Sequence, residues 1–366
     1  MRVMGVTISE AFSGADREIF SELKTRNYLA GVVTHDIPGL WKGLFLLRSF
    51  RCDRRKWFSG WRRKMMKSPR SFKLRTAAVA KQLEEANGNF DVVLQVSGLF
   101  APYPKQFPHP VTLFCDYTTK LAERNYPLWF GLPSSEVSDW YDLETALYQK
   151  CTKIFTASEN TRLSLIKDYA VRPQNIRTVG EGVRVMPPVH EMQHKHPTIL
   201  MVGLDFERKG GLILLDAFSK VRQALPNARL IVVGPSPRSN AEGVTWMGQV
   251  SDRSKLDQLF TESAVFAMPS FCEPFGLAII EAMSHGLPVI GSTVDAMREI
   301  VREGETGYLV EPGNAEELAG RLIELLSSSE LCRVMGEAGR DRVKTSFLWS
   351  QVVDRIEQDL REVARP

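Results

Sequence analysis

Short apolar runs alternate along the chain with longer segments in which apolar residues recur at helical spacing. The short runs predict buried strands, and the longer segments predict amphipathic helices. This alternation is typical of a parallel sheet with crossover helices, so the sequence predicts an α/β fold. In the first half we expect strands at residues 30–34, 91–96, 111–115 and 153–156, and helices at residues 75–87 and 138–150. In the second half we expect strands at residues 198–202, 228–233, 264–268, 288–290 and 307–310, and helices at residues 211–224, 276–284 and 315–326.

The length of 366 residues predicts two domains, because one hydrophobic core seldom extends over so long a chain. Residues 184–197 are polar, contain proline and lack periodicity, and are therefore the predicted linker. The linker separates an N-terminal domain, residues 1–183, from a C-terminal domain, residues 198–349. Three of the six histidines lie in the linker. No cysteine or carboxylate cluster completes a metal-ligand set there, so a solvated linker is favoured over a metal site.

The five cysteines lie far apart and include no C-x-x-C pair, which predicts neither a disulfide framework nor a zinc site. Widely spaced, unpaired cysteines are typical of proteins in a reducing compartment. The N-terminal segment contains an acid, Glu10, and no apolar run approaches the roughly 18–20 residues of a membrane span. The sequence therefore predicts a cytoplasmic protein that is neither exported nor integral to a membrane.

Charge is distributed unevenly between the two halves. Residues 1–190 contain 28 Lys and Arg against 18 Asp and Glu, net +10, whereas residues 191–366 contain 19 against 25, net −6. Residues 51–75 hold eleven basic residues and one acid, with aromatic and Met residues between them. Cations interleaved with aromatic rings favour contact with an anionic membrane at its inner face. The alternatives are a solvated face and, least favoured, nucleic-acid binding. The predicted membrane or acceptor surface consists of Arg54, Arg55, Trp57, Trp61, Arg62, Arg63 and Lys64.

Residues 269–288 carry the clearest chemistry. A buried strand ends near Met268, a loop with proline and glycine follows, and an apolar helix begins after it. The backbone N–H groups of Phe275, Gly276 and Leu277 would then point from the helix N-terminus, which is a ready phosphate site. Glu273 lies on the loop, and Glu281 lies inside the apolar helix, where a carboxylate needs partners. Sugar and ribose hydroxyls are suitable hydrogen-bond donors to both carboxylates. In the alternative interpretation, Glu273 caps the helix and Glu281 pairs with an Arg.

This segment resembles glycosyltransferase family 4. The resemblance rests on Glu-x7-Glu from Glu273 to Glu281, on the Pro-Phe-Gly-Leu between them, and on Gly-Leu-Pro-Val-Ile at residues 286–290. It extends to residues 304–314, 202–203, 208–211 and 233–235, and so covers about residues 198–330. The resemblance implies the GT-B architecture of two Rossmann-like domains that face each other across a cleft. It also implies metal-independent catalysis with retention of anomeric configuration, and a helix in residues 350–366 that returns to the first domain.

The resemblance further implies a role for each matching residue. Glu273 would hold donor-sugar hydroxyls, Glu281 would hold the ribose, and the amides near Gly276 and Leu277 would take the phosphate. Arg208 and Lys209 would neutralise the diphosphate leaving group, which a metal-free transfer requires. The implied donor-binding residues are Glu281, Phe275, Gly276, Leu277, Gly203, Gly234 and Pro235.

The chain departs from the family pattern at two donor-side positions. Leu204 stands where many members have Arg, and residues 294–297 replace a frequent Gly-Gly.

Two further segments belong to the first half. Asp116 follows a predicted strand in a motif that resembles the family His-Asp pair with Cys115 in place of His, so it is a candidate for contact with the acceptor or donor sugar. A loop-capping Asp is the alternative. The single glycine of residues 9–15 favours an ordinary turn over a phosphate loop.

The predicted function is transfer of a hexose from a UDP- or GDP-sugar to a saccharide or lipid-linked acceptor, as in cell-surface polysaccharide or glycolipid synthesis. No cofactor and no metal are expected, and the partners are the nucleotide-sugar donor and the acceptor. The alternatives are a sugar-nucleotide epimerase or hydrolase of the same fold and a non-catalytic binding module that uses residues 51–75.

Overall fold

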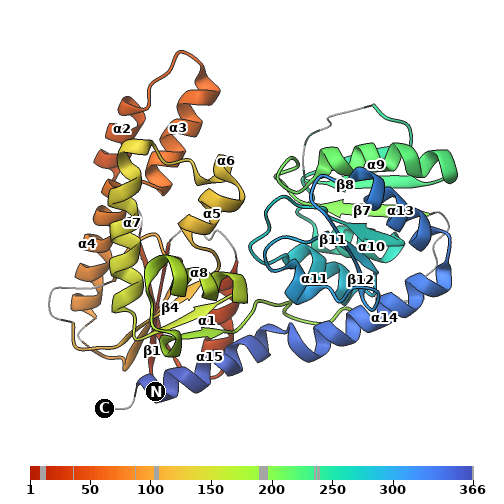
Figure 1. The fold of residues 1–366 in the computed structure, drawn as a ribbon. Coiled ribbons are helices and arrows are strands. Elements are labelled where there is room, and N and C mark those ends of the chain that lie inside the picture. The colour runs from red at the N-terminus through yellow and green to blue at the C-terminus, as the bar shows by residue number, and fades with distance from the viewer. Residues whose placement is uncertain are drawn as a thin grey trace. The chain divides into compact units, whose positions relative to one another are not determined.

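A computed structural model describes residues 1–8, 14–35, 37–86, 88–102, 107–188, 197–234, 236 and 240–364 of the chain. These residues form two compact units (Figure 1). Unit 1 is residues 1–179 with residues 352–366, and unit 2 is residues 180–351. Within the predicted linker, residues 184–188 belong to unit 2, and residues 189–196 lie outside the described part of the chain.

Unit 1 is built on a six-stranded parallel sheet with the order β2-β1-β3-β4-β5-β6. The central strands are buried along their whole length, which explains their continuous apolar runs. The strands are β1 (Val3–Ile8), β2 (Leu29–His35), β3 (Val92–Val96), β4 (Val111–Cys115), β5 (Lys153–Thr156) and β6 (Ile176–Thr178). The helices are α1 (Ala15–Thr25), α2 (Gly39–Arg48), α3 (Arg54–Met66), α4 (Pro69–Glu85), α5 (Thr119–Asn125), α6 (Pro127–Phe130), α7 (Ser134–Lys150) and α8 (Glu159–Tyr169), with a 3₁₀ turn at Pro173–Asn175.

Unit 2 is built on a second six-stranded parallel sheet with the order β12-β11-β10-β7-β8-β9. In each sheet the strand order switches direction beside the first strand of the unit, between β1 and β3 in unit 1 and between β7 and β10 in unit 2. Open α/β sheets bind ligands at such points, outside the carboxyl ends of the strands. The strands are β7 (Thr198–Val202), β8 (Arg229–Val233), β9 (Val244–Gly248), β10 (Val265–Ala267), β11 (Val289–Ser292) and β12 (Gly307–Val310). The helices are α9 (Gly211–Ala224), α10 (Arg253–Glu262), α11 (Leu277–Ser284), α12 (Met297–Ile300), α13 (Ala315–Leu326) and α14 (Ser329–Ser346).

The last helix, α15 (Trp349–Val363), starts in unit 2 and continues as part of unit 1. Its apolar face is fully buried at Val352, Val353, Ile356 and Leu360. Trp349 is the first residue of α15, and its backbone N–H donates to the Val183 carbonyl over 3.1 Å.

The predicted α/β fold is confirmed, and the sheets contain strands at every predicted position. Three strands, β1, β6 and β9, are absent from the predicted set. Gly5 and Thr7 interrupt the apolar run of β1, β6 has three residues, and β9 is an edge strand that is partly exposed. The helix predicted at residues 75–87 begins earlier, at Pro69, where Ser68 and Ser71 form a capping box.

Candidate functional site

The carboxyl ends of β7 and β8 meet through two glycines. The Gly203 N–H donates to the Val233 carbonyl over 2.9 Å. Gly234 has φ +119°, and a Cβ built on it would lie 2.4 Å from the Gly203 oxygen. Only glycine allows this approach, because any side chain would clash with backbone. The two predicted donor-site glycines are therefore neighbours, while Pro235 lies outside the described residues.

The loop before α9 carries the two predicted phosphate-binding cations. Gly210 has φ +74°, and a Cβ there would lie 2.0 Å from the Pro269 oxygen, so the loop lies directly against the segment after β10. Arg208 is buried, and its Nη1 donates to the Cys272 carbonyl over 2.5 Å. Its Nε donates to Asp205 over 3.2 Å. The guanidinium is thus held in one orientation by partners on both sides.

Glu273 lies beside these two cations. Its Oε2 is 3.0 Å from Lys209 Nζ and 3.6 Å from Arg208 Nη1, and its side chain is 9% exposed. Its own N–H donates to Asp295 Oδ2 over 2.9 Å. Because Asp205 also pairs with Arg208, two cations and two carboxylates lie together here. Arg and Lys are the side chains that bind a diphosphate. The structure therefore brings Arg208, Lys209 and Glu273 together, as the sequence predicts.

Asp295 was not among the predicted site residues. It adopts φ 45°, which is uncommon for a residue other than glycine, and it fixes the Glu273 backbone. Its sequence signal is the departure from the family pattern at residues 294–297, where aspartate tolerates the left-handed backbone that glycine otherwise supplies.

The N-terminus of α11 presents backbone amides as predicted. Gly276 is the N-cap residue with φ 110° and no side-chain cap. The amides of Phe275, Gly276 and Leu277 donate to no acceptor among the described residues. Such amides at the positive end of a helix favour an anion. Glu273 does not cap this helix, so that part of the alternative interpretation is not observed.

Glu281 lies on α11 and accepts a hydrogen bond from Arg253. The Arg253 Nη1 to Glu281 Oε1 distance is 2.7 Å, and the Glu281 side chain is 26% exposed. The other part of the alternative, an Arg partner for Glu281, is therefore present in the structure. Because Arg253 is 56% exposed, this ion pair leaves the carboxylate accessible and contributes little to stability.

Asp257 and His285 extend this group of charges. Arg253 Nε lies 3.0 Å from Asp257, and His285 Nε2 lies 3.2 Å from the same carboxylate. The His285 ring stacks on Phe260, with centroids 4.9 Å apart. Burial lowers the pKa of His285 to about 4, and the nearby Arg253 acts in the same direction. The imidazole is therefore neutral at physiological pH.

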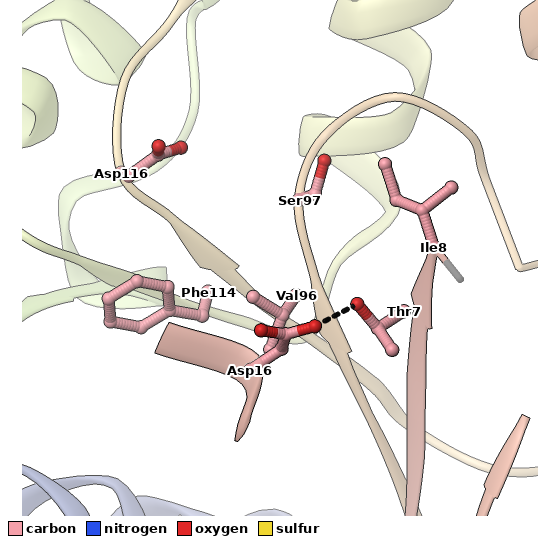
Figure 2. Close-up of a pocket in the computed structure, with 7 residues that line it drawn as sticks. All are labelled: Thr7, Ile8, Asp16, Val96, Ser97, Phe114 and Asp116. Carbon is pink, nitrogen blue, oxygen red and sulfur yellow. Dashed lines mark hydrogen bonds between the residues drawn. The ribbon is translucent and has the colours of Figure 1, made fainter. Parts of the chain in front are cut away.

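Unit 1 has a small pocket at the carboxyl ends of β1, β3 and β4, with a volume of about 40 Å³ (Figure 2). Its polar residues are Thr7, Asp16, Ser97 and Asp116. Thr7 Oγ1 donates to Asp16 Oδ2 over 2.8 Å, and Asp16 is buried. Ser97 has φ 86°, a strained conformation often kept at functional sites. Of these four residues the sequence predicts Asp116 alone.

The glycine of the candidate phosphate loop is the N-cap residue of α1. Gly14 is the α1 N-cap with φ 78°, and Asp16 follows in the first turn. That Gly-Ala-Asp spacing is the sequence signal for Asp16. The rest of the candidate glycine loop, residues 9–13, lies outside the described residues.

Buried charges lie close to Asp116. Burial raises the pKa of Asp116 and of Glu144, and burial lowers the pKa of Lys67, whose positive charge acts on both carboxyls. Glu144 accepts hydrogen bonds from Thr119 over 2.5 Å and from Tyr169 over 2.6 Å. Nothing in the sequence pattern connects these residues, since they come from different elements.

Cys115, which stands where the family has His, is buried and within 3.9 Å of the Tyr148 hydroxyl. Burial raises the pKa of its thiol, so the group is neutral and fills space.

The basic segment forms α3 and the start of α4. Trp57 Nε1 donates to the Leu46 carbonyl over 2.7 Å, and Trp61 Nε1 donates to the Lys42 carbonyl over 3.0 Å. Both indoles therefore join α3 to α2. Arg54 and Arg62 are exposed, Lys64 is partly exposed, and the side chains of Arg55 and Arg63 lie outside the described part of the structure.

Within the described ranges, no three His, Cys, Asp or Glu side chains gather as metal ligands would. The expected independence from metals and cofactors stays a prediction.

None of the helices that the structure describes is both long and apolar enough to cross a membrane.

Residues 184–342 match the sequence family described as glycosyl transferases group 1. This range holds Gly203, Arg208, Lys209, Glu273 and Glu281. This part of the chain is similar in sequence to the group 1 glycosyl transferases, and the chain also resembles proteins named as mannosyltransferases. The predicted relationship to glycosyltransferases is thereby confirmed, and the epimerase, hydrolase and binding-module alternatives gain no support from it.

Two relatives of this glycosyltransferase are named for the sugar that they transfer. An MMP alpha-(1->4)-mannosyltransferase of Mycolicibacterium hassiacum is 28% identical over 309 residues, which are 78% of this chain and 72% of that protein. A phosphatidyl-myo-inositol mannosyltransferase of Mycobacterium leprae is 34% identical over 176 residues, 46% of this chain and 47% of that protein. The chain thus spans about half the length of several curated relatives that it matches.

Solved structures show the fold of the glycosyltransferase over its whole length. Sucrose-phosphate synthase from Thermosynechococcus elongatus has a TM-score of 0.74 at 18% identity, with 99% of each chain covered. WaaG, a glycosyltransferase involved in lipopolysaccharide biosynthesis, has a TM-score of 0.68 at 17% identity, with 98% of this chain and 99% of that chain covered. The two Rossmann-like units are therefore of GT-B type, as predicted.

Proposed function

We propose that the chain is a retaining, metal-independent hexosyltransferase that uses a UDP- or GDP-sugar. The acceptor is a saccharide or a lipid-linked molecule, as in the synthesis of surface polysaccharides or glycolipids. The observation that carries the proposal is the group formed by Arg208, Lys209 and Glu273 beside the open amides of α11.

This group supplies what a nucleotide-sugar donor requires. The diphosphate needs positive charge, which Arg208, Lys209 and the α11 N-terminus provide without a metal ion. The sugar and ribose carry hydroxyls, which Glu273 and Glu281 accept. Glu273 lies on the loop before α11 and Glu281 lies within α11, so along the chain one carboxylate precedes the open amides and the other follows them.

Glycosyl transfer then consists of one exchange of bonds at the anomeric carbon. The acceptor hydroxyl oxygen forms a bond to the anomeric carbon. At the same time, and on the same face of the ring, the bond between the anomeric carbon and the β-phosphate oxygen breaks. The hydroxyl proton passes to the departing phosphate oxygen. Arg208 and Lys209 stabilise the negative charge that grows on the diphosphate, and they are fixed before the reaction, so little reorganisation is needed.

Asp116 is the proposed sugar-binding group of unit 1. It lines the pocket with Ser97, and burial raises its pKa, so its carboxyl is suited to hydrogen bonding with sugar hydroxyls. Lys67 supplies a nearby positive charge that limits the rise of this pKa.

A peripheral contact with an anionic membrane is the second part of the proposal. Arg54, Arg62 and Lys64 lie on α3, and Phe58 on the same helix is 40% exposed. Cations together with an exposed ring favour the headgroup layer. Nucleic acid is not an expected partner.

The test measures donor binding and turnover separately. Calorimetric titration with a panel of UDP- and GDP-sugars identifies the donor, and the two relatives named as mannosyltransferases make a mannose donor the first to try. We expect Glu281→Ala to weaken nucleotide binding and Glu273→Ala to lower kcat, each by about 1–3 kcal/mol.

Glu262→Gln on α10 is the matched control, since that exposed carboxylate is bonded only to Gln258 among the described side chains. Unchanged kinetics in both test variants would contradict the assignment. Consumption of the sugar nucleotide without any acceptor would show an epimerase or hydrolase instead.

A further inference from the structure

Four helices of unit 1 enclose a second pocket with a volume of about 540 Å³. Arg48 comes from α2, Lys64 from α3, Arg70 and Lys73 from α4, and Glu136 and Asp139 from α7. The pocket has no residue in common with the donor site or with the pocket at Asp116. Its charge is net positive, because four cations face two carboxylates.

The cations of this pocket lack carboxylate partners. Arg48 and Lys73 are exposed and form no ion pair within the described ranges. Lys64 Nζ donates to the Arg48 carbonyl over 3.0 Å, and the Arg70 guanidinium lies 4.1 Å from the Trp41 ring centre. Lys64 and Arg70 are thus oriented by a neutral carbonyl and a ring, and their charge remains available to an anion.

Glu136 adds an acceptor to the same pocket. Its Oε2 is buried and has no hydrogen-bond partner among the described residues. A buried carboxylate oxygen without a donor is costly, and a hydroxyl from a ligand would satisfy it. The pocket therefore offers cations for a phosphate and an open acceptor for a hydroxyl of the same molecule.

Exposed apolar side chains lie next to the pocket. They belong to α2 and to the residues that directly follow this helix. Leu44 is 37% exposed, Leu47 is 71% exposed and Phe50 is 58% exposed. Leu47 precedes Arg48, and Leu44 precedes Phe45, which also lines the pocket. In Figure 1 the hairpin of α2 and α3 extends beyond the sheet of unit 1. Apolar groups that flank cations are typical of a surface that enters the headgroup layer of a membrane.

We infer that this pocket binds the phosphodiester headgroup of an anionic membrane lipid. Arg48, Lys64, Arg70 and Lys73 take the phosphate, Glu136 accepts from a headgroup hydroxyl, and Leu47 and Phe50 enter the lipid layer. The inference rests on the proposed function, since it places the enzyme at the membrane where a lipid-linked acceptor is found.

The experiment is flotation of the full-length protein with vesicles. Vesicles of phosphatidylcholine alone are compared with vesicles of phosphatidylcholine and phosphatidylglycerol in about equal amounts. We expect binding to the mixed vesicles only. Because each cation near the surface contributes about 1 kcal/mol, R48Q/K73Q should lower the affinity by about 30-fold. L47S/F50S should also lower the affinity, although it leaves the charge unchanged.

The matched control is K24Q/K167Q, which removes the same charge from exposed residues of unit 1. Lys24 lies in the last turn of α1, and Lys167 lies in the last turn of α8. Neither lysine lines the pocket, which is next to the N-terminus of α4. We expect less than about a threefold change for this control.

Three results would overturn the inference. One is equal loss of vesicle binding in R48Q/K73Q and K24Q/K167Q. Another is binding of glycerol phosphate that depends on Arg48 and Lys73 without any binding to vesicles, which would show a soluble phosphate ligand. The third is affinity for a single-stranded oligonucleotide in place of vesicles.

Donor binding is measured in the same samples to separate this inference from the proposed function. R48Q/K73Q should titrate with the nucleotide sugar as the wild type does. If the wild type binds vesicles but no UDP- or GDP-sugar, the proposed function fails and the pocket assignment stands.

Discussion

At the scale of single residues, the donor site depends on charges that are buried together. Glu273 has two cationic neighbours, and Arg208 donates to Asp205 and to the Cys272 carbonyl and forms an ion pair with Glu273. Removing one member leaves the others buried without compensation, which costs more than the ion pair itself contributes. These residues therefore serve stability as well as binding.

Arg208→Ala should lower the free energy of unfolding by about 3 kcal/mol, because Glu273 and the Cys272 carbonyl lose a buried partner. Urea denaturation followed by circular dichroism measures this change. Arg302→Ala is the control, since Arg302 is 54% exposed and pairs with Glu305 at the surface, and it should cost less than about 1 kcal/mol. Equal losses in the two variants would show that the Arg208 pairs are no stronger than surface pairs.

His285 should make stability depend on pH. Its pKa is about 4 in the folded protein and near 6.5 when unfolded, so the unfolded chain binds more protons between these values. Stability is therefore full above about pH 6.5 and falls as the pH drops toward 4, by on the order of 2 kcal/mol after solvent screening. Asp257, Arg253 and Arg340 are the charged groups that face the ring.

Denaturation curves recorded between pH 4 and 7 test this dependence. His285→Gln should flatten the slope, because the substituted side chain does not titrate. A slope that is the same in both proteins would assign the pH dependence to other groups.

At the scale of elements, the start of α11 is fixed by glycine. Gly276 has φ 110°, and a Cβ built on it would lie 2.3 Å from the Met297 Cε on α12. The amides that follow it keep their direction only if this turn is unstrained. The phosphate site of α11 thus depends on the positive φ of Gly276.

Gly276→Ala should weaken nucleotide-diphosphate binding by at least about tenfold and lower stability by about 1–3 kcal/mol, because the φ of 110° opposes a Cβ, whereas the Met297 methyl group lies at the end of a flexible side chain and can move aside. Titration calorimetry and denaturation measure the two effects. Gly320→Ala in α13 has nothing within 4 Å of its new Cβ. It should instead stabilise the protein by about 0.5–1 kcal/mol. Unaltered binding in Gly276→Ala would remove this turn from the site.

At the scale of the whole molecule, two units with separate cores share one helix. Ile356 of α15 is fully buried and belongs to unit 1, whereas Leu322 of α13 is fully buried in the core of unit 2. Each sheet has its own hydrophobic cluster. Two unfolding transitions are therefore expected rather than one.

Differential scanning calorimetry should separate the two units. Ile356→Ala should lower the Tm of one transition and Leu322→Ala that of the other, since each substitution costs about 2–5 kcal/mol in its own core. A nucleotide diphosphate should raise the Tm of the transition that Leu322→Ala lowers, because ligand binds only the folded unit 2. A single transition that both substitutions shift equally would contradict independent units.

The sequence alone determined the α/β class and the local chemistry of unit 2. Apolar runs and helical periods are properties of neighbouring residues, so the described strands other than β1, β6 and β9 could be predicted without a structure. Glu273, Gly276 and Glu281 lie within one loop and one helix, and local spacing sufficed to group them.

Only the tertiary structure decided which residues meet from distant parts of the chain. Arg253 at Glu281, Asp295 at Glu273, Lys67 near Asp116, and the pocket of four helices join different elements. The structure also turned Trp57 and Trp61 toward α2 and left Leu47 and Phe50 exposed in their place. The pattern of one segment cannot determine these contacts, because they depend on how separate elements pack against one another.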